Sequence, residues 1–345
     1  MVCPKSRTWL VLLACALPCA LPSAWAAPQY QPTRQELESV MADLIAWLPG
    51  AWDSYPQVHY QRRYVTPVEG EHPHWHHVFA RIDAPQVGEV VFYGQINPGG
   101  RDQPLMHRSQ ILYKVWIDEK RGAVVINGQG PADPDRFVNL HERPALWGEV
   151  RMRDEKSLQC DFLWRRSGEQ IVGILDGKSD DRRRGGPGTC TYKVKDTDVE
   201  FFADAEWVLG PEILWDYDIN TMAGHQFVGR ADRTHIKQYR TRGYRCRVED
   251  ANGVRDWHAH DRGATLAVTS DTKQTQRVML LRAPLPNGAG VGMHDALRLA
   301  LLPLGSEQPV HEVGAAPMAP SAELNHAGVQ VRCELTKDLP AMHSK

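Results

Sequence analysis

The stretch LIAWLPGAWDSYPQ, residues Leu44 to Gln57, contains an abrupt change from one structural element to the next. Pro49-Gly50 ends a helical pattern, and Trp52 stands at the start of the second element. The residues that define the helix are the capping-box pair Thr33 and Glu36 and the apolar positions Leu37, Val40, Met41, Leu44 and Leu48. The pattern predicts an amphipathic helix over 34–48, with a new element directly after it.

Most of the chain beyond this helix has the composition of β-strands. Val, Ile, Tyr, Phe and Trp are frequent in short segments, and turn residues such as Pro98-Gly99-Gly100 separate them. The expected strands lie near 57–65, 75–83, 89–97, 108–118, 122–127, 158–165, 169–175, 189–195 and 199–207. Nine or ten antiparallel strands with short turns, preceded by one helix, predict a mainly β protein with a closed barrel around a small cavity.

One end of such a barrel has to be filled, because unfilled apolar volume costs stability. The helix over 34–48 can cover that end. Trp52 is bulky and carries one N–H donor, so it is expected to fill the floor just inside the first strand.

The chain after about Tyr244 differs in composition from the barrel region. Proline and glycine cluster in 284–292 and 314–320, and apolar runs occur at 278–281 and 297–302. We expect a barrel domain over 27–243 and a mostly β C-terminal extension over 244–345.

The first 26 residues have the features of an export signal. A basic start precedes an apolar run, Trp9 to Leu17, that is too short to span a bilayer, and Ala24-Trp25-Ala26 offers small residues for cleavage before Ala27. A lipid-attachment site at Leu12 to Cys15 is the alternative. No later segment is long and apolar enough to span a membrane. The mature chain is therefore expected to be periplasmic or secreted.

Cleavage would leave four of the seven cysteines, an even number that favours disulfides in an exported protein. Four cysteines permit three pairings, and we favour Cys160–Cys190 with Cys246–Cys333. None of the four has a CxxC partner, which argues against redox chemistry and thiolate zinc.

Several functional classes have little support. The formal net charge of -2 lacks the basic excess of a nucleic-acid-binding protein. No Ser/His/Asp motif, Walker loop or dinucleotide fingerprint is present.

Short motifs between about Leu37 and Arg240 have an order that resembles the CpcT/CpeT family of T-type chromophore lyases. The motifs are LIAWLPGAWDSYPQ, VVFYGQINPGGRDQPLMHRSQILYKV, LQCDFLWRRSGEQIVGIL, GTCTYKV and AEWVLGPEILWDYDINTMAGHQFVGRADRTHIKQYR. The resemblance implies a lipocalin-like (calycin-like) barrel that attaches open-chain tetrapyrroles, the bilins, to cysteines of phycobiliproteins. Phycobiliproteins are assembled inside the cell, so for an exported chain the fold is expected to carry over better than the reaction. Whether the chain is an enzyme stays open.

The resemblance also implies site residues. Arg108 would face the ligand propionates, while Glu206 or Asp218 would face the pyrrole N–H groups and support protonation of the ligand. The alternative is that Arg108 and Glu206 form a structural ion pair and that Asp218 caps a turn. Gln57, Tyr93, Gln95 and Trp52 are the candidate pocket-lining residues. Tyr93 and Gln95 share one face of their strand, and the alternation leaves open whether that face is inside or outside the barrel.

Histidines supply a separate hypothesis. His72, His74 and His76 recur every second residue, so on a strand they would share a face and bind a transition metal. His258 and His260 would add two more ligands. The alternative is that these histidines are solvated and that the protein holds no metal.

The sequence thus predicts an exported barrel that binds a small apolar ligand, with a bilin or another tetrapyrrole as the candidate. A non-catalytic envelope scaffold, in which the C-terminal extension contacts a protein partner or a second copy of the chain, is the alternative.

Overall fold

The computed structural model describes residues 30–65, 70–105, 109–153, 161–175, 190–193, 200–222, 225–228, 234–286 and 293–336. From Pro32 onward the chain forms one compact unit. The described part is mainly β, as predicted, with a closed antiparallel barrel and two further four-stranded sheets. No helix in these ranges is long and apolar enough to cross a membrane.

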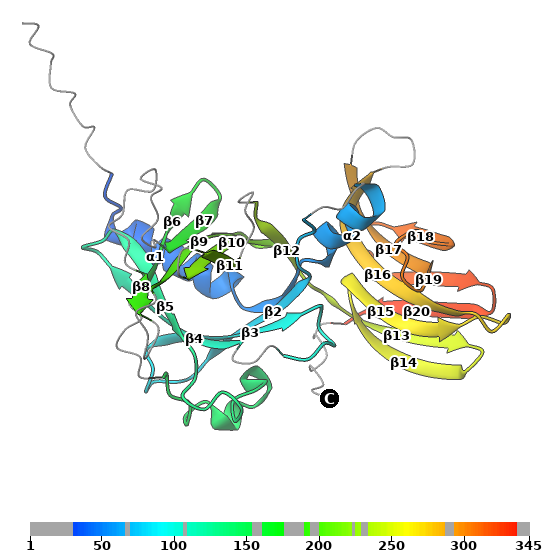
Figure 1. Ribbon diagram of the computed structural model, residues 1–345, viewed down its shortest axis with the longest axis horizontal. Coiled ribbons are helices and arrows are strands. Elements are labelled where there is room, and N and C mark those ends of the chain that lie inside the picture. The colour runs from blue at the N-terminus through cyan, green and yellow to red at the C-terminus, as the bar shows by residue number, and fades with distance from the viewer. Residues whose placement is uncertain are drawn as a thin grey trace, which may run out of the picture. The chain divides into compact units, whose positions relative to one another are not determined.

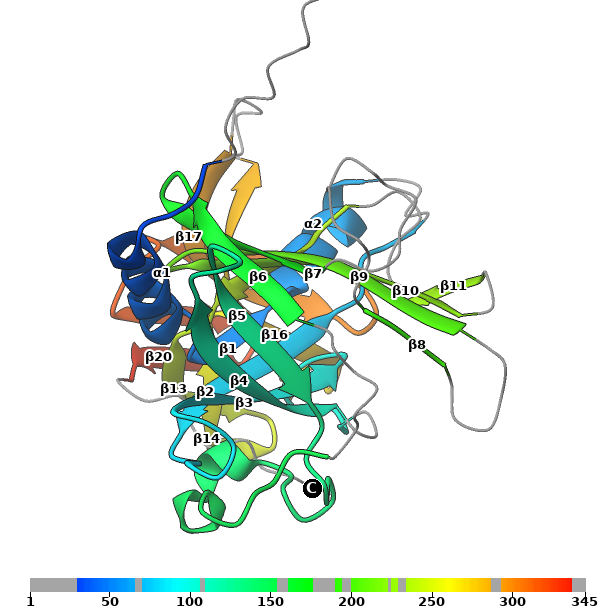
Figure 2. The same cartoon turned by 90° about the vertical axis from the view of Figure 1, so that its left-hand side faces the viewer.

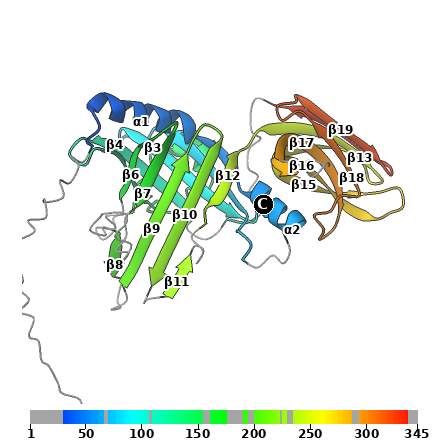
Figure 3. The ribbon, with the colours of Figure 1, turned by 90° about the horizontal axis from the view of Figure 1, so that it is seen from above.

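Ten antiparallel strands form the barrel, and the ring closes where β9 pairs with β10 (Figure 3). In order around the ring they are β10 (Ile213–Met222), β12 (Ile236–Arg240), β1 (Gly50–Asp53), β2 (Trp75–Ile82), β3 (Val90–Pro98), β4 (Gln110–Asp118), β5 (Ala123–Gln129), β6 (Asp161–Ser167), β7 (Gln170–Leu175) and β9 (Glu200–Leu209). Two short strands, β8 (Thr191–Lys193) and β11 (His225–Val228), pair with β9 and β10. The predicted barrel is confirmed.

The N-terminal helix α1 (Arg34–Trp47) begins at the predicted capping box, in which Thr33 and Glu36 cap each other. Its apolar face joins the barrel core through Val40, Leu44 and Leu48. Figure 2 shows α1, in dark blue, beside the strands of the barrel wall. Trp52 is fully buried in the same core and donates its indole N–H to the Leu48 carbonyl at 3.0 Å. The helix and this tryptophan together fill one end of the barrel.

The strand expected near 57–65 is wrong, because this segment forms a second helix, α2 (Tyr55–Tyr64). Pro56 lies in its first turn, where a missing N–H costs nothing. The Asp53 carboxylate accepts the backbone N–H of Tyr55 at 2.8 Å and so helps to start the helix. Tyr55 and Val58 then pack against residues of the C-terminal sheets.

A segment after β5 covers part of the outer barrel wall. It contains two short 3-10 helices, η1 (Leu140–Glu142) and η2 (Pro144–Leu146). Its buried residues Phe137, Leu140 and Val150 form a core cluster with residues of β2, β3 and β4. One stretch of the barrel is therefore buried on both faces.

The C-terminal extension is mostly β, as predicted, and forms a two-sheet sandwich (Figure 1). One sheet contains β14 (Gly253–His260), β13 (Gly243–Asp250), β20 (Val329–Leu335) and β19 (Ser321–His326), and the other contains β15 (Arg262–Thr269), β16 (Thr275–Pro286), β17 (Met293–Pro303) and β18 (His311–Ala315). Alternate residues of both sheets share one buried core, from Tyr244 and Cys246 on one side to Leu280 and Leu299 on the other.

The structure contains the predicted Cys246–Cys333 disulfide, with an S–S distance of 2.07 Å. These two cysteines lie directly opposite each other on β13 and β20. Cys190 is also disulfide-bonded, while its predicted partner, Cys160, lies outside the described residues.

Candidate functional site

The barrel interior is lined by large aromatic side chains together with aliphatic ones. Successive strand residues point to opposite faces, and one face of each barrel strand contributes to the interior core. The aromatic residues of that core include Trp52, Phe79, Phe92, Tyr113, Trp164 and Trp207. Trp207 makes edge contacts with Phe79 and Trp164 in this core.

Polar side chains interrupt this aromatic lining where β2, β10 and β12 are close to one another. Asp216 lies opposite Trp207 in the β9–β10 register and shares the inward face of β10 with Leu214 and Asp218. His77 lies two residues before Phe79 on β2, and Gln238 lies opposite Leu214 on β12. We call His77, Asp216, Asp218 and Gln238 the inner polar cluster.

Three members of the inner polar cluster carry buried polar atoms without hydrogen-bond partners among the described residues. His77, Asp216 and Gln238 are 1%, 2% and 0% exposed. In the described part of the chain, the two ring nitrogens of His77, the amide atoms of Gln238 and Asp216 Oδ1 make no hydrogen bond of normal geometry, although the Gln238 amide lies near both other side chains. Buried polar atoms are nearly always paired, so a group of unpaired ones needs an explanation, and a bound ligand, water or ion is one such explanation.

Burial also controls the ionisation of this cluster. Burial, and then the nearby charge of Asp218, raises the pKa of Asp216 well above its usual range. The same two carboxyl groups add to the effect of burial in raising the pKa of Tyr113. Burial and the neighbouring His76 lower the pKa of His77 to about 3. The cluster therefore favours neutral groups: a protonated Asp216 and an uncharged His77.

A cavity of about 70 Å³ adjoins the inner polar cluster. Its lining includes Trp75, Asp216, Asp218 and Thr234. The volume is about half that of an engineered 150 Å³ cavity that admits benzene. This volume is large enough for a few waters or the edge of a ring, and the lining combines aromatic side chains with carboxyl groups.

The structure separates the two acids that the sequence predicted for the site. Asp218 lines the cavity. Glu206 lies on the opposite face of β9 from Trp207 and contacts the His235 ring, with Oε1 3.1 Å from Nε2. The predicted cation Arg108 lies outside the described residues, so neither its ligand role nor its pairing with Glu206 is described.

Tyr93 and Gln95 share a strand face, as predicted, but that face points away from the lumen. The Tyr93 hydroxyl donates to Gln95 Oε1 at 2.7 Å and to the Phe137 carbonyl at 3.0 Å. Gln95 also donates to Asn139 Oδ1 at 2.7 Å. The pair fastens the segment with η1 and η2 to the outer wall and does not line the cavity.

The other two predicted pocket residues also have structural contacts. Gln57 lies on α2, where it donates to the His235 carbonyl at 3.1 Å and accepts the Lys237 backbone N–H at 2.8 Å. Trp52 fills the barrel floor, as its size predicts.

The histidines predicted to share a face fall into two groups. The His72 ring contacts Gln61 and Thr234. The rings of His74 and His76 lie against Asp53, an acid that the histidine motif does not predict. His260 joins this second group and His258 does not. Asp53 stands in the opening sequence stretch, but only the pairing of β1 with β2 places it beside the histidines.

Asp216, His77 and Gln238 were not predicted as site residues. One signal was available, because Asp216 and Asp218 alternate in the sequence WDYDIN and would share a strand face. For His77 and Gln238 no sequence signal distinguishes the inward from the outward face of their strands.

The chain matches no protein-family model and no curated protein. The likeness to the CpcT/CpeT lyases therefore rests on the short motifs alone. The helix-capped barrel agrees with the fold that this likeness implies. A shared fold does not establish a shared reaction, because the chemistry depends on the residues of the site.

Proposed function

We propose that the barrel binds a small ligand with an aromatic body and N–H donors, and that the inner polar cluster receives its N–H edge. The observation that carries this proposal is the burial of unpaired atoms of His77, Asp216 and Gln238, together with a cavity that Asp216 and Asp218 line. Unpaired buried polar atoms cost free energy in the empty protein. A ligand that hydrogen-bonds to them recovers this cost and is selected over ligands that do not.

A tetrapyrrole fits this chemistry and is the ligand that the family resemblance suggests. Its pyrrole N–H groups would donate to the carboxyl oxygens of Asp216 and Asp218, and its rings would lie against the aromatic lining. Because the cavity is about 70 Å³, one ring edge would enter it and the rest of the ligand would extend outward.

We propose binding as the activity of this chain, in an oxidising compartment outside the cytoplasm. The Cys246–Cys333 disulfide supports that compartment. Attachment of a bilin to a cysteine would need an acceptor protein in the same compartment. Because its pKa is raised, Asp216 would be protonated and could donate a proton in such a step.

Absorbance titration of the mature protein with biliverdin tests the proposal. We expect a saturable red shift with the wild-type protein. In Asp216→Leu and in Asp218→Asn the affinity for biliverdin should fall about tenfold, which corresponds to about 1.4 kcal/mol. Glu206→Gln is the matched control, because this carboxyl lies on the other face of the wall and should leave the titration unchanged. Thermal unfolding would show that each variant folds.

Two results would contradict the assignment. An unshifted biliverdin spectrum with the wild-type protein would remove the tetrapyrrole. Equal binding by wild type, Asp216→Leu and Asp218→Asn would place the ligand elsewhere. Haem, titrated in parallel, distinguishes a preference for open-chain tetrapyrroles from binding of any flat aromatic ligand.

A further inference from the structure

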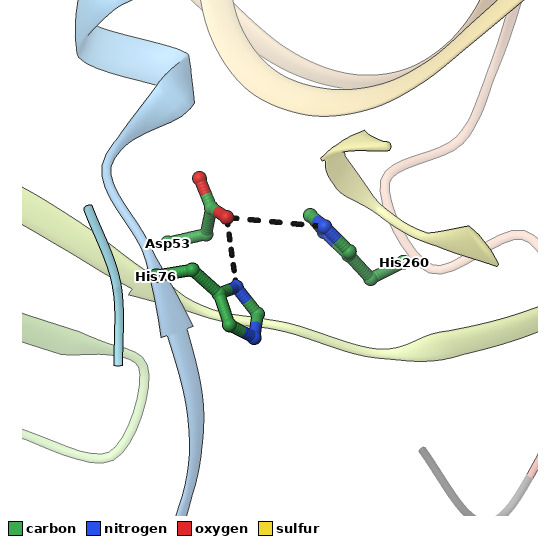
Figure 4. Close-up of side chains that lie close together, drawn as sticks. All are labelled: Asp53, His76 and His260. Carbon is green, nitrogen blue, oxygen red and sulfur yellow. Dashed lines mark hydrogen bonds and ion pairs between the residues drawn. The ribbon is translucent and has the colours of Figure 1, made fainter. Parts of the chain in front are cut away.

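Asp53 lies at the centre of a group of buried imidazoles that is separate from the inner polar cluster. It ends β1, His76 lies on the neighbouring β2, and His260 ends β14 of the sandwich. These three residues are 0%, 1% and 4% exposed. Figure 4 shows the rings of His76 and His260 approaching the same side of the Asp53 carboxylate.

The distances in this group are close to those of a metal site. His76 Nδ1 lies 2.8 Å from Asp53 Oδ2, and His260 Nε2 lies 3.8 Å from the same oxygen. One ligand atom from each residue lies within 4.8 Å of the other two. Zinc bonds of about 2.0–2.2 Å would place two ligand atoms of a tetrahedral site about 3.3 Å apart. The two measured distances lie on either side of that value.

The second oxygen of Asp53 is already held by other groups. Asp53 Oδ1 lies 2.9 Å from His74 Nε2 and accepts the Tyr55 backbone N–H at 2.8 Å. This arrangement orients the carboxylate so that Oδ2 faces His76 and His260. Support of a ligand carboxylate by such outer hydrogen bonds is typical of metal centres.

His260 is the member that a hydrogen-bond network alone explains poorly. Its Nε2 is too far from Asp53 Oδ2, at 3.8 Å, for a direct hydrogen bond. Its Nδ1 is 3.3 Å from the Arg262 backbone nitrogen, which is long for a hydrogen bond. A metal ion between His260 Nε2 and Asp53 Oδ2 would bind to both atoms. Nδ1 would then carry the ring proton and would no longer accept the Arg262 N–H.

We propose that Asp53, His76 and His260 bind one divalent transition-metal ion, with His74 as a positioning residue. Two imidazoles and a carboxylate suit zinc, and a fourth position would remain for water or another group. The site joins the barrel, through β1 and β2, to β14 of the sandwich. It does not depend on the proposed barrel ligand.

The site is tested by adding zinc to the full mature protein after treatment with a chelator. Calorimetry measures the affinity, and elemental analysis measures the stoichiometry. We expect one zinc ion per chain, and a melting temperature that rises with zinc. His260→Gln should weaken binding at least 100-fold, while His74→Gln should weaken it about 10- to 100-fold as an outer hydrogen-bond partner. His258 is an exposed histidine on the same strand, so His258→Gln is the matched control and should bind zinc with wild-type affinity.

Cobalt(II) gives an independent readout of the ligand set. Absorption bands of tetrahedral cobalt should appear in wild type and His258→Gln and be absent from His260→Gln. Failure of the wild type to bind zinc at stoichiometric concentration would overturn the proposal. So would undiminished zinc affinity in a folded His260→Gln variant, which would identify the group as a hydrogen-bond network only. His260 is changed rather than Asp53, because Asp53 also accepts the Tyr55 backbone N–H and its replacement would disturb the start of α2.

Discussion

The guanidinium of Arg240 lies over the indole ring of Trp52, with its central carbon 4.3 Å from the ring centroid. The two residues are directly opposite each other in the pairing of β1 with β12. Arg240 also donates to the Pro49 carbonyl at 2.7 Å and to the Pro211 carbonyl at 2.6 Å. One side chain on the last barrel strand therefore secures the turn after α1 and the tryptophan of the barrel floor.

Replacing Arg240 should destabilise the protein more than replacing an exposed arginine. Arg240→Ala removes the cation–π contact and leaves the Pro49 carbonyl without this donor, so we expect a loss of about 2–4 kcal/mol in the free energy of unfolding. Urea unfolding measures it. Arg245→Ala, on the exposed face of β13, is the control and should change stability by less than about 0.5 kcal/mol. Similar values for the two variants would contradict the role of Arg240.

Position 50 favours glycine because of its backbone angle and because the Arg240 guanidinium lies beside it. A Cβ atom at Gly50 would lie 2.5 Å from Arg240 Nη1, and the Gly50 φ angle is +136°. Both features disfavour any other residue, so Gly50→Ala should cost about 1–3 kcal/mol. Gly148→Ala is the matched control, because a Cβ there meets nothing within 4 Å. Thermal unfolding of the two variants should separate them clearly, and equal melting temperatures would refute the argument.

The network around Gln95 should control the segment that covers the outer wall. Gln95→Leu removes the hydrogen bonds of Gln95 with the Tyr93 hydroxyl, the Asn139 side chain and the Asn139 backbone N–H, which connect β3 to this segment. We expect faster amide hydrogen exchange in 131–152 and little change in the C-terminal sandwich. Biliverdin binding should stay as in wild type, because Gln95 is outside the lumen. Weakened binding without faster exchange in 131–152 would instead support Gln95 as a ligand contact.

Glu307 should make stability depend on acid pH. Burial alone would raise its pKa, but hydrogen bonds from His59 and Arg277 and the charge of Arg277 lower it to about 2. The unfolded chain, with a pKa near 4.5, takes up this proton first. The stabilisation is therefore complete above about pH 4.5 and is lost as pH falls towards 2, amounting to about 1–3 kcal/mol once solvent screening is included.

Glu307→Gln tests this assignment. The variant should lose about 3 kcal/mol at neutral pH, because His59 and Arg277 lose their buried partner. The difference from wild type should shrink between pH 4.5 and 2. Glu334→Gln alters a carboxylate that is 65% exposed and should show a stability difference near zero throughout. A difference for Glu307→Gln that stays constant with pH would show that this carboxyl does not titrate with folding.

Local sequence determined the elements whose signals are local. Thr33 and Glu36 set the start of α1, Pro49-Gly50 set its end, and the two-residue alternation in β4 marked a strand. Asp216 and Asp218 also had to share a face once they lay on one strand. These features depend on backbone geometry and on neighbours within a few residues.

Only the tertiary structure decided which face of a strand became the interior and which distant residues met. The segment after Asp53 became a helix because Tyr55 and Val58 are buried against Met279 and Leu281 of the sandwich. Tyr93 faces outward because the segment with η1 and η2 covers the outer wall there. Asp53 and His260 meet through barrel closure and sandwich packing, and long-range burial of this kind leaves no trace in local sequence pattern.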